Sequence, residues 1–201
     1  MKRGDTNLSV MSIVFGKGDK YLYESFPLGG TNNGLLDKVN VEYVAEHDEA
    51  VSSLASGKAD IIMIPEPKVT AAKAKIDGAH IALDLTKEWS AITNTELAQG
   101  VLVVRKNFAS EHSDIVDAFL EEYKTSVNYT NENSKEAAAL IAEYGIIPNE
   151  QMALAAIPNC HIVYIDGKEM HKAMTDMLAT LHAANPKSIG GKLPGEDIFY
   201  K

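Results

Sequence analysis

Two polar clusters in this sequence have residue types that could bind a small molecule or move a proton. Glu46 and His47 begin an acidic run, and Glu66 stands between the prolines Pro65 and Pro67. Carboxylates and imidazoles accept hydrogen bonds and transfer protons. Each cluster also has a structural interpretation. The acids of the first can simply favour the positive end of a helix, and Glu66 can be a helix cap.

The remaining candidates are aromatic and metal-binding side chains. Trp89 is the only tryptophan and lies in a polar stretch, where it is either a pocket wall or a plug on the surface. None of the six histidines has a second ligand at metal-binding spacing, and His161 beside Cys160 lacks a third local partner. The sequence therefore predicts no metal site and no cofactor.

Common signatures and charge patterns exclude several function classes. The sequence has no Gly-x-Ser-x-Gly, Walker, strand-linked Gly-x-Gly-x-x-Gly or His-Glu-x-x-His motif, which weighs against the commonest enzymes. The 28 acidic and 19 basic residues give a net charge of −9, with no basic block for nucleic acid. No apolar run approaches the ~20 residues of a membrane span. The N-terminus has no apolar signal-peptide segment.

The two clusters need elements that position them, and the apolar patterns predict strands that alternate with helices. This order is typical of an α/β fold with a largely parallel sheet, in which ligands bind beyond the carboxyl ends of strands. Both clusters follow predicted strands. We expect strands at 8–15, 21–23, 39–43, 59–64, 79–85, 101–105 and 160–165, and helices starting near residues 47, 67, 110 or 113, 134, 148 and 168.

Several segments together resemble the substrate-binding proteins of ABC transporters, in the group for nitrate, sulfonate, taurine and thiamine-precursor uptake. The resemblance covers about residues 34–201. It is carried by Val-Glu-Tyr-Val-Ala-Glu-His (41–47), Leu-Ala-Ser-Gly-Lys-Ala-Asp-Ile (54–61), Ile-Pro-Glu-Pro (64–67), Ala-Leu-Asp-Leu-Thr-Lys-Glu-Trp (82–89), Val-Val-Arg-Lys-Asn-Phe (103–108), Ala-Ala-Ile-Pro-Asn-Cys (155–160) and the ending 184–194.

The resemblance implies a type II periplasmic-binding-protein fold, with two α/β lobes, mostly parallel sheets and an incomplete first lobe. Residues 1–25 would be a remnant of the first lobe and the first crossover, and 26–100 the second lobe. Residues 101–201 would form the return crossover and the helix-rich end of the first lobe. The ligand-binding residues implied by this resemblance are Glu46, His47, Pro65, Glu66, Pro67 and Gln99.

The function implied is that of an importer's solute-binding component and not of an enzyme. It would bind a small polar or anionic organic solute in an interlobe cleft and deliver it to an ABC permease outside the cytoplasmic membrane. One alternative is a truncated paralogue that folds but binds no ligand and has no transport function. In one form of this alternative the paralogue is a homodimer. A less favoured alternative is a thiamine-pyrimidine-synthase-like enzyme, because the lone Cys160 does not supply that family's cysteine-rich motif.

Overall fold

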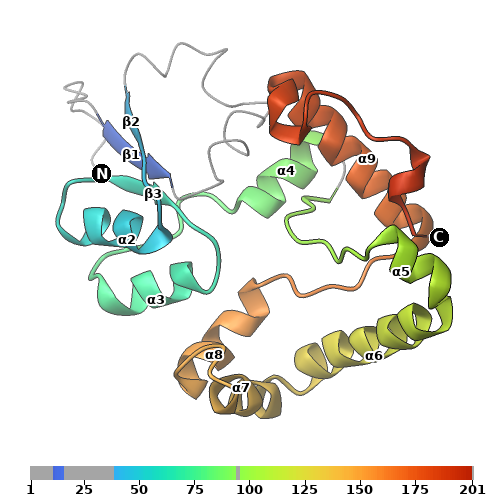
Figure 1. The fold of residues 1–201 in the computed structure, drawn as a ribbon. Helices are drawn as coiled ribbons and strands as arrows, with labels where there is room; N and C mark the ends of the chain where they lie inside the picture. Colours follow the sequence, from blue (N-terminus) through green and yellow to red (C-terminus); the bar gives the residue numbers. More distant parts are fainter. Residues whose placement is uncertain (1–10, 16–38, 94–95, 201) are drawn as a thin grey trace. The chain divides into compact units, whose positions relative to one another are not determined.

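A computed structural model describes residues 11–15, 39–93 and 96–200 of the chain (Figure 1). The chain divides into two compact units. Unit 1 consists of Met1–Ile92 and Leu178–Leu193, and unit 2 of Thr93–Met177 and Pro194–Lys201. The expected division at residues 25/26 and 100/101 stays a prediction.

Unit 1 contains a three-stranded parallel sheet. Its strands are β1 (Met11–Phe15), β2 (Val39–Tyr43) and β3 (Ile61–Met63), in the order β2-β1-β3. In the register, Ile13 pairs with Val41. Because β2 and β3 are both parallel to β1 and lie on either side of it, the chain must cross over β1 between them, and helix α2 lies in this connection.

Three helices of unit 1 lie between β2 and β3 or after β3 in the chain. These are α2 (His47–Ala55), α3 (Lys68–Lys75) and α4 (Leu85–Thr93). Gly57, just beyond α2, has φ +70°, and its N–H donates to the carbonyl of Leu54. This left-handed conformation favours glycine, as the sequence predicts. The short 3-10 helix η3 (Pro186–Ile189) also belongs to this unit.

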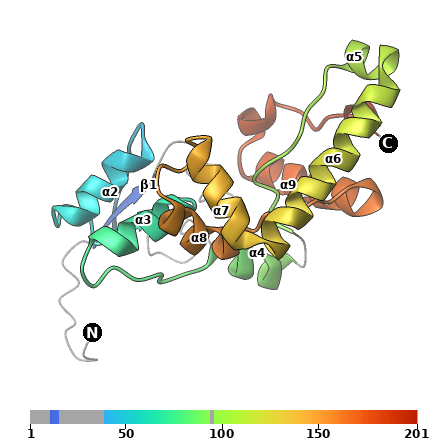
Figure 2. The same cartoon turned by 90° about the horizontal axis from the view of Figure 1, so that it is seen from below.

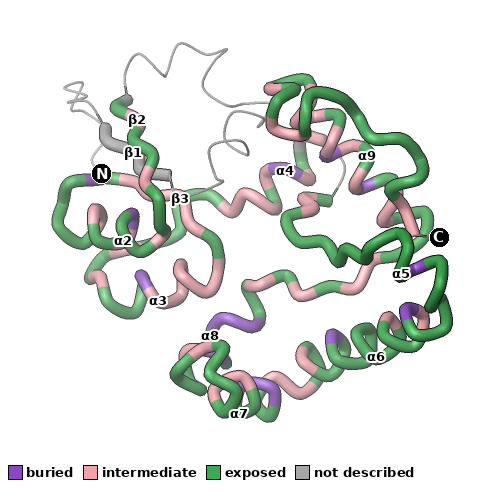
Figure 3. Tube along the Cα trace, in the orientation of Figure 1, coloured by how far each residue is buried: buried purple, intermediate pink, exposed green. Residues whose placement is uncertain are grey.

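The fully buried side chains of the core beneath α2 are small. Ala50 on α2 and Ala59 before β3 are buried, and Val44, Ile62 and Ile64 pack against them. Figure 3 colours the buried positions of the described chain purple. Alanine at the contact lets a helix approach a strand closely. The tight packing fixes the start of α2 relative to the end of β3.

Unit 2 is helical in the part of the chain that the structure describes. Its elements are α5 (Lys106–Glu111), α6 (Ser113–Glu132), α7 (Ser134–Glu143), α8 (Glu150–Ala156), and the 3-10 helices η2 (Ile157–Asn159) and η4 (Glu196–Ile198). The last long helix, α9 (Gly167–Ala184), begins in unit 2 and ends in unit 1.

The core of unit 2 lies between α7 and α8, which are side by side in both views (Figures 1 and 2). The buried residues there are Ala137, Ala138, Ala153 and Ile157. Asn149 caps α8, because its side-chain oxygen accepts the Met152 N–H at 3.0 Å. Gly145, beyond α7, has φ +69° and ends that helix as expected.

The expected fold class is wrong. The sequence predicts two α/β lobes with mostly parallel sheets, but the described chain is mostly helical, and its only strands are the three short ones of unit 1. Residues 79–84, 101–105 and 160–165, all expected in strands, have no strand structure. A short apolar run predicts a strand only when a neighbouring strand pairs with it, and these runs have none in the described structure.

Trp89 is also placed differently from the prediction. The polar stretch around it forms helix α4 instead of a loop, and the Trp89 side chain is fully buried. The Asp84 carboxylate starts this helix by accepting the backbone N–H groups of Thr86 and Lys87, at 3.2 and 3.4 Å. Trp89 is therefore a core residue, neither a pocket wall nor a surface plug.

Candidate functional site

The carboxyl edge of the unit 1 sheet brings most of the predicted site residues together. Strands β2 and β3 are both parallel to β1, so they end at the same edge. Glu46 and His47 follow β2, and the run Pro65–Pro67 follows β3. We call residues 44–49 and 64–70 the carboxyl edge. Gln99 is not part of it, since this exposed residue belongs to unit 2.

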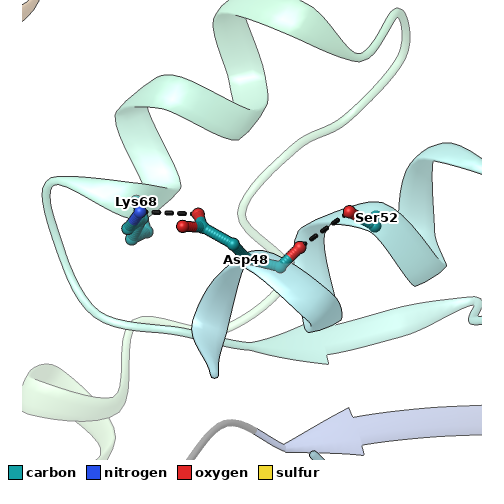
Figure 4. Close-up of polar contacts among 3 residues, drawn as sticks. All are labelled: Asp48, Ser52 and Lys68. Atoms are coloured by element: carbon teal, nitrogen blue, oxygen red, sulfur yellow. Dashed lines mark hydrogen bonds and ion pairs between the residues drawn. The ribbon is translucent and has the colours of Figure 1, made fainter. Parts of the chain in front are cut away.

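An ion pair joins the two halves of the carboxyl edge. The Lys68 ammonium, at the start of α3, donates to Asp48 Oδ1 on α2 at 2.5 Å (Figure 4). The Ser52 hydroxyl donates to the backbone carbonyl of Asp48 at 2.8 Å. Lys68 has no signal in the sequence that would mark it as a site residue, because it lies twenty residues from Asp48 and no local pattern pairs them.

The pair changes the titration of Asp48. The Lys68 hydrogen bond and charge hold the pKa of Asp48 below its ordinary value of 3.8. A carboxyl whose pKa is depressed in the folded chain stabilises it at pH values above 3.8, and this stabilisation is lost as the pH falls through the lowered pKa. In carboxyl-carbon NMR titrations we expect the Asp48 midpoint below 3.8, and a return towards 3.8 in Lys68→Met. An unchanged midpoint in that variant would contradict the pairing.

Glu66 is committed to the backbone of α3. Its carboxylate accepts the Thr70 N–H at 3.0 Å and the Thr70 hydroxyl at 3.1 Å. The Pro65 carbonyl accepts the N–H groups of Lys68 and Val69, at 3.0 and 3.3 Å. The first amides of α3 are thus already bonded within the chain. Of the two interpretations of Glu66, these contacts favour the helix cap.

Glu46, unlike Glu66, does not cap a helix with its side chain. It occupies the N-cap position of α2 with extended backbone angles, but its side chain makes no capping hydrogen bond. Instead, Glu49 reaches back and accepts the Ala45 N–H at 3.3 Å. The Glu46 side chain is exposed, and His47 beside it is half-buried. Glu46 is therefore the carboxylate at this edge best placed to meet a ligand.

Negative charge dominates the carboxyl edge. Lys68 is the only lysine or arginine of the carboxyl edge, and its ammonium is paired with the Asp48 carboxylate. Ligand groups that donate hydrogen bonds bind more favourably beside these carboxylates, whereas an anionic ligand would be repelled by them. The carboxylates of the edge are those of Glu46, Asp48, Glu49 and Glu66.

The fold has a counterpart among solved structures. The chain is similar to a chain in the crystal structure of an ABC transporter from Parabacteroides distasonis, with a TM-score of 0.71 and 20% sequence identity. The likeness covers 96% of this chain and 66% of that one, so this chain spans about two thirds of the solved chain's length. At this identity the match defines a shared fold. The predicted likeness to ABC transporter proteins is thereby confirmed in its coarse form.

The family follows from the sequence. Residues 35–175 match the family described as Menaquinone biosynthesis, and the chain belongs to that family. No curated protein matches the chain. The uptake group that the sequence suggests, for nitrate, sulfonate, taurine or thiamine precursors, stays a prediction.

The family overturns the expectation that the chain is not an enzyme. Menaquinone biosynthesis is an enzymatic process, so membership points towards a catalytic role. Missing motifs support that expectation only weakly, because those motifs mark only the commonest enzyme classes. None of the helices in the described ranges is both long and apolar enough to cross a membrane. No group of three metal-ligating side chains occurs among the described residues.

Proposed function

We propose that this chain acts in menaquinone biosynthesis by binding a small polar organic molecule at the carboxyl edge. The observation that carries the proposal is the family match over residues 35–175, a range that contains the whole edge. Ligand binding at this place also agrees with the general location of sites in parallel sheets. The acidic surroundings favour the polar alternative of the predicted ligand over the anionic one.

The residues at the edge take different roles in this proposal. Glu46 accepts a hydrogen bond from the ligand, and its carboxylate together with the His47 imidazole provides groups for proton transfer. Glu66 caps the start of α3, and the Asp48–Lys68 pair links α2 to α3 at the surface. Gln99, which lies in unit 2, stays a prediction from the resemblance alone.

Binding of menaquinone precursors to Glu46 variants tests this assignment. Removing a charged acceptor from a ligand hydrogen bond costs about 1.5–3 kcal/mol, so Glu46→Gln should weaken binding by about tenfold or more. Calorimetric titration of the purified chain with individual precursors measures this. Glu42→Gln is the matched control, since Glu42 is an exposed acid within β2, and it should bind normally. Equal affinities in the two variants would contradict a role for Glu46.

A second candidate function is solute binding for an ABC importer. It is favoured by the match to the ABC transporter structure, which extends over 96% of this chain. In this role the chain would lie outside the cytoplasmic membrane and pass its solute to a permease. The biosynthetic role and the importer role share the ligand site and differ in the fate of the bound molecule. An importer component releases the molecule unchanged, whereas a biosynthetic enzyme converts it.

A further inference from the structure

Residues 195–200, which we call the strap, bond to two helices of unit 2 through acidic side chains. The Glu196 carboxylate accepts a hydrogen bond from His171 Nε2 on α9 at 2.7 Å. The Asp197 carboxylate accepts one from the Lys106 ammonium on α5 at 3.1 Å, and this contact is an ion pair. The strap therefore bridges α9 and α5 through two neighbouring residues.

Two aromatic residues of the strap extend this bridge to a third helix. The Phe199 ring lies against the His171 ring, with centroids 4.2 Å apart. The Tyr200 hydroxyl donates to Asp117 Oδ1 on α6 at 3.0 Å and lies 3.4 Å from the carbonyl oxygen of Ser113. The strap and its partners on α5, α6 and α9 all belong to unit 2. One short segment thus contacts three helices of the same unit.

The polar contacts to α5 and α9 hold the strap only weakly. The side chains of Lys106 and Asp197 are each 76% exposed, and that of Glu196 is 86% exposed. Exposed pairs contribute little, because water screens the charges and the side chains lose freedom when they pair. The turn inside the strap, η4, has three residues and is too short to be stable by itself. The strap can therefore open while the helices beneath it stay folded.

We propose that the strap is a releasable fastening, which holds the first half of α9 to α5 and α6 and opens as one unit. Helix α9 is the element that it controls, because α5 and α6 already pack against each other, whereas both Glu196 and Phe199 contact α9 through His171. The inference does not depend on the ligand site, since the carboxyl edge lies in unit 1.

Two backbone amides report on the opening of the strap. The N–H groups of Ile198 and Phe199 donate to the carbonyls of Gly195 and Glu196, both at 3.2 Å. These bonds form the turn inside the strap, so the amides are protected from solvent exchange only while the strap is closed. Hydrogen exchange of both amides in the full chain, followed by NMR, measures how often the strap opens.

Two helix-side variants weaken the strap without changing its own residues. Lys106→Met removes the ion pair, and His171→Phe removes the hydrogen bond but keeps a ring against Phe199. Each should speed exchange of both strap amides about two- to fivefold, and the double variant about tenfold. Raising NaCl from about 0.05 to about 0.5 M should speed exchange in the unmodified chain and less so in Lys106→Met. Lys172→Met is the matched control and should change nothing, since Lys172 of α9 pairs with Asp176 of the same helix.

The position of α9 is tested by spin labels on exposed residues of α6 and α9. The labels are attached at Glu122→Cys and Thr175→Cys after the chain's single cysteine is removed by Cys160→Ser. The distance between the labels should have one narrow distribution with the strap intact. The distribution should broaden when Lys106→Met and His171→Phe are added.

Three results would overturn the proposal. Unchanged exchange of the strap amides in the double variant would show that the two contacts do not hold the strap. An equal rise in exchange at Ala138 and Ala153, in the core between α7 and α8, would show unfolding of the whole unit instead of opening of the strap. An unchanged distance distribution would show that the strap does not hold α9.

Discussion

Replacing Trp89 with alanine is expected to lower the free energy of unfolding by about 3–5 kcal/mol. The indole is fully buried on α4, and no other large side chain among the described residues is buried so completely. Alanine would leave a cavity of indole size in unit 1, which the surrounding structure can fill only in part. Urea unfolding followed by circular dichroism measures the loss, since the variant lacks the chain's only tryptophan as a fluorophore.

Two further variants control this result. Trp89→Phe keeps much of the buried aromatic surface and should lose less stability than Trp89→Ala. Leu83→Ala, at an exposed residue shortly before α4, should stay within about 0.5 kcal/mol of the unmodified chain. A loss below about 1 kcal/mol in Trp89→Ala would mean that the side chain is not a core residue in solution.

The second large effect is expected in unit 2. Ile157→Ala should destabilise the chain by about 2–5 kcal/mol, because Ile157 is buried in η2 against alanines of α7 and α8. The alanine neighbours cannot extend into the cavity that the lost side chain leaves, and Ile141 and Ile147, which also pack against this cluster, can fill it only in part. The measurement is again urea unfolding. The matched control is Ile146→Ala, since Ile146 is 72% exposed and its loss should cost less than about 0.5 kcal/mol. Equal losses in the two variants would contradict the assigned core.

Local signals in the sequence were sufficient for many elements. Alternating apolar residues predict β2, and helical spacing with a following glycine predicts α2 and α7, all of which the structure confirms. These signals act within one element. The strand predicted at 101–105 is wrong because its formation does not depend on local signals alone. The segment is apolar, but a strand needs a partner strand from elsewhere in the chain, and Val103 is 89% exposed.

The candidate site was predictable in outline and not in its contacts. The positions of Glu46 and Pro65–Pro67 at strand ends suffice to place them at one edge of a parallel sheet. Whether Glu66 caps a helix or faces a ligand depends on the position of Thr70, and only the structure gives it. The Asp48–Lys68 pair depends on how α2 and α3 pack, which no sequence spacing encodes.

The most direct test of the proposed role is to incubate the purified chain with individual menaquinone precursors and follow each by mass spectrometry. We predict that one precursor is converted to a product of different mass, and that Glu46→Gln slows this conversion while Glu42→Gln does not. Recovery of every precursor unchanged, together with tight binding of a transported solute, would contradict the biosynthetic role and favour the importer function.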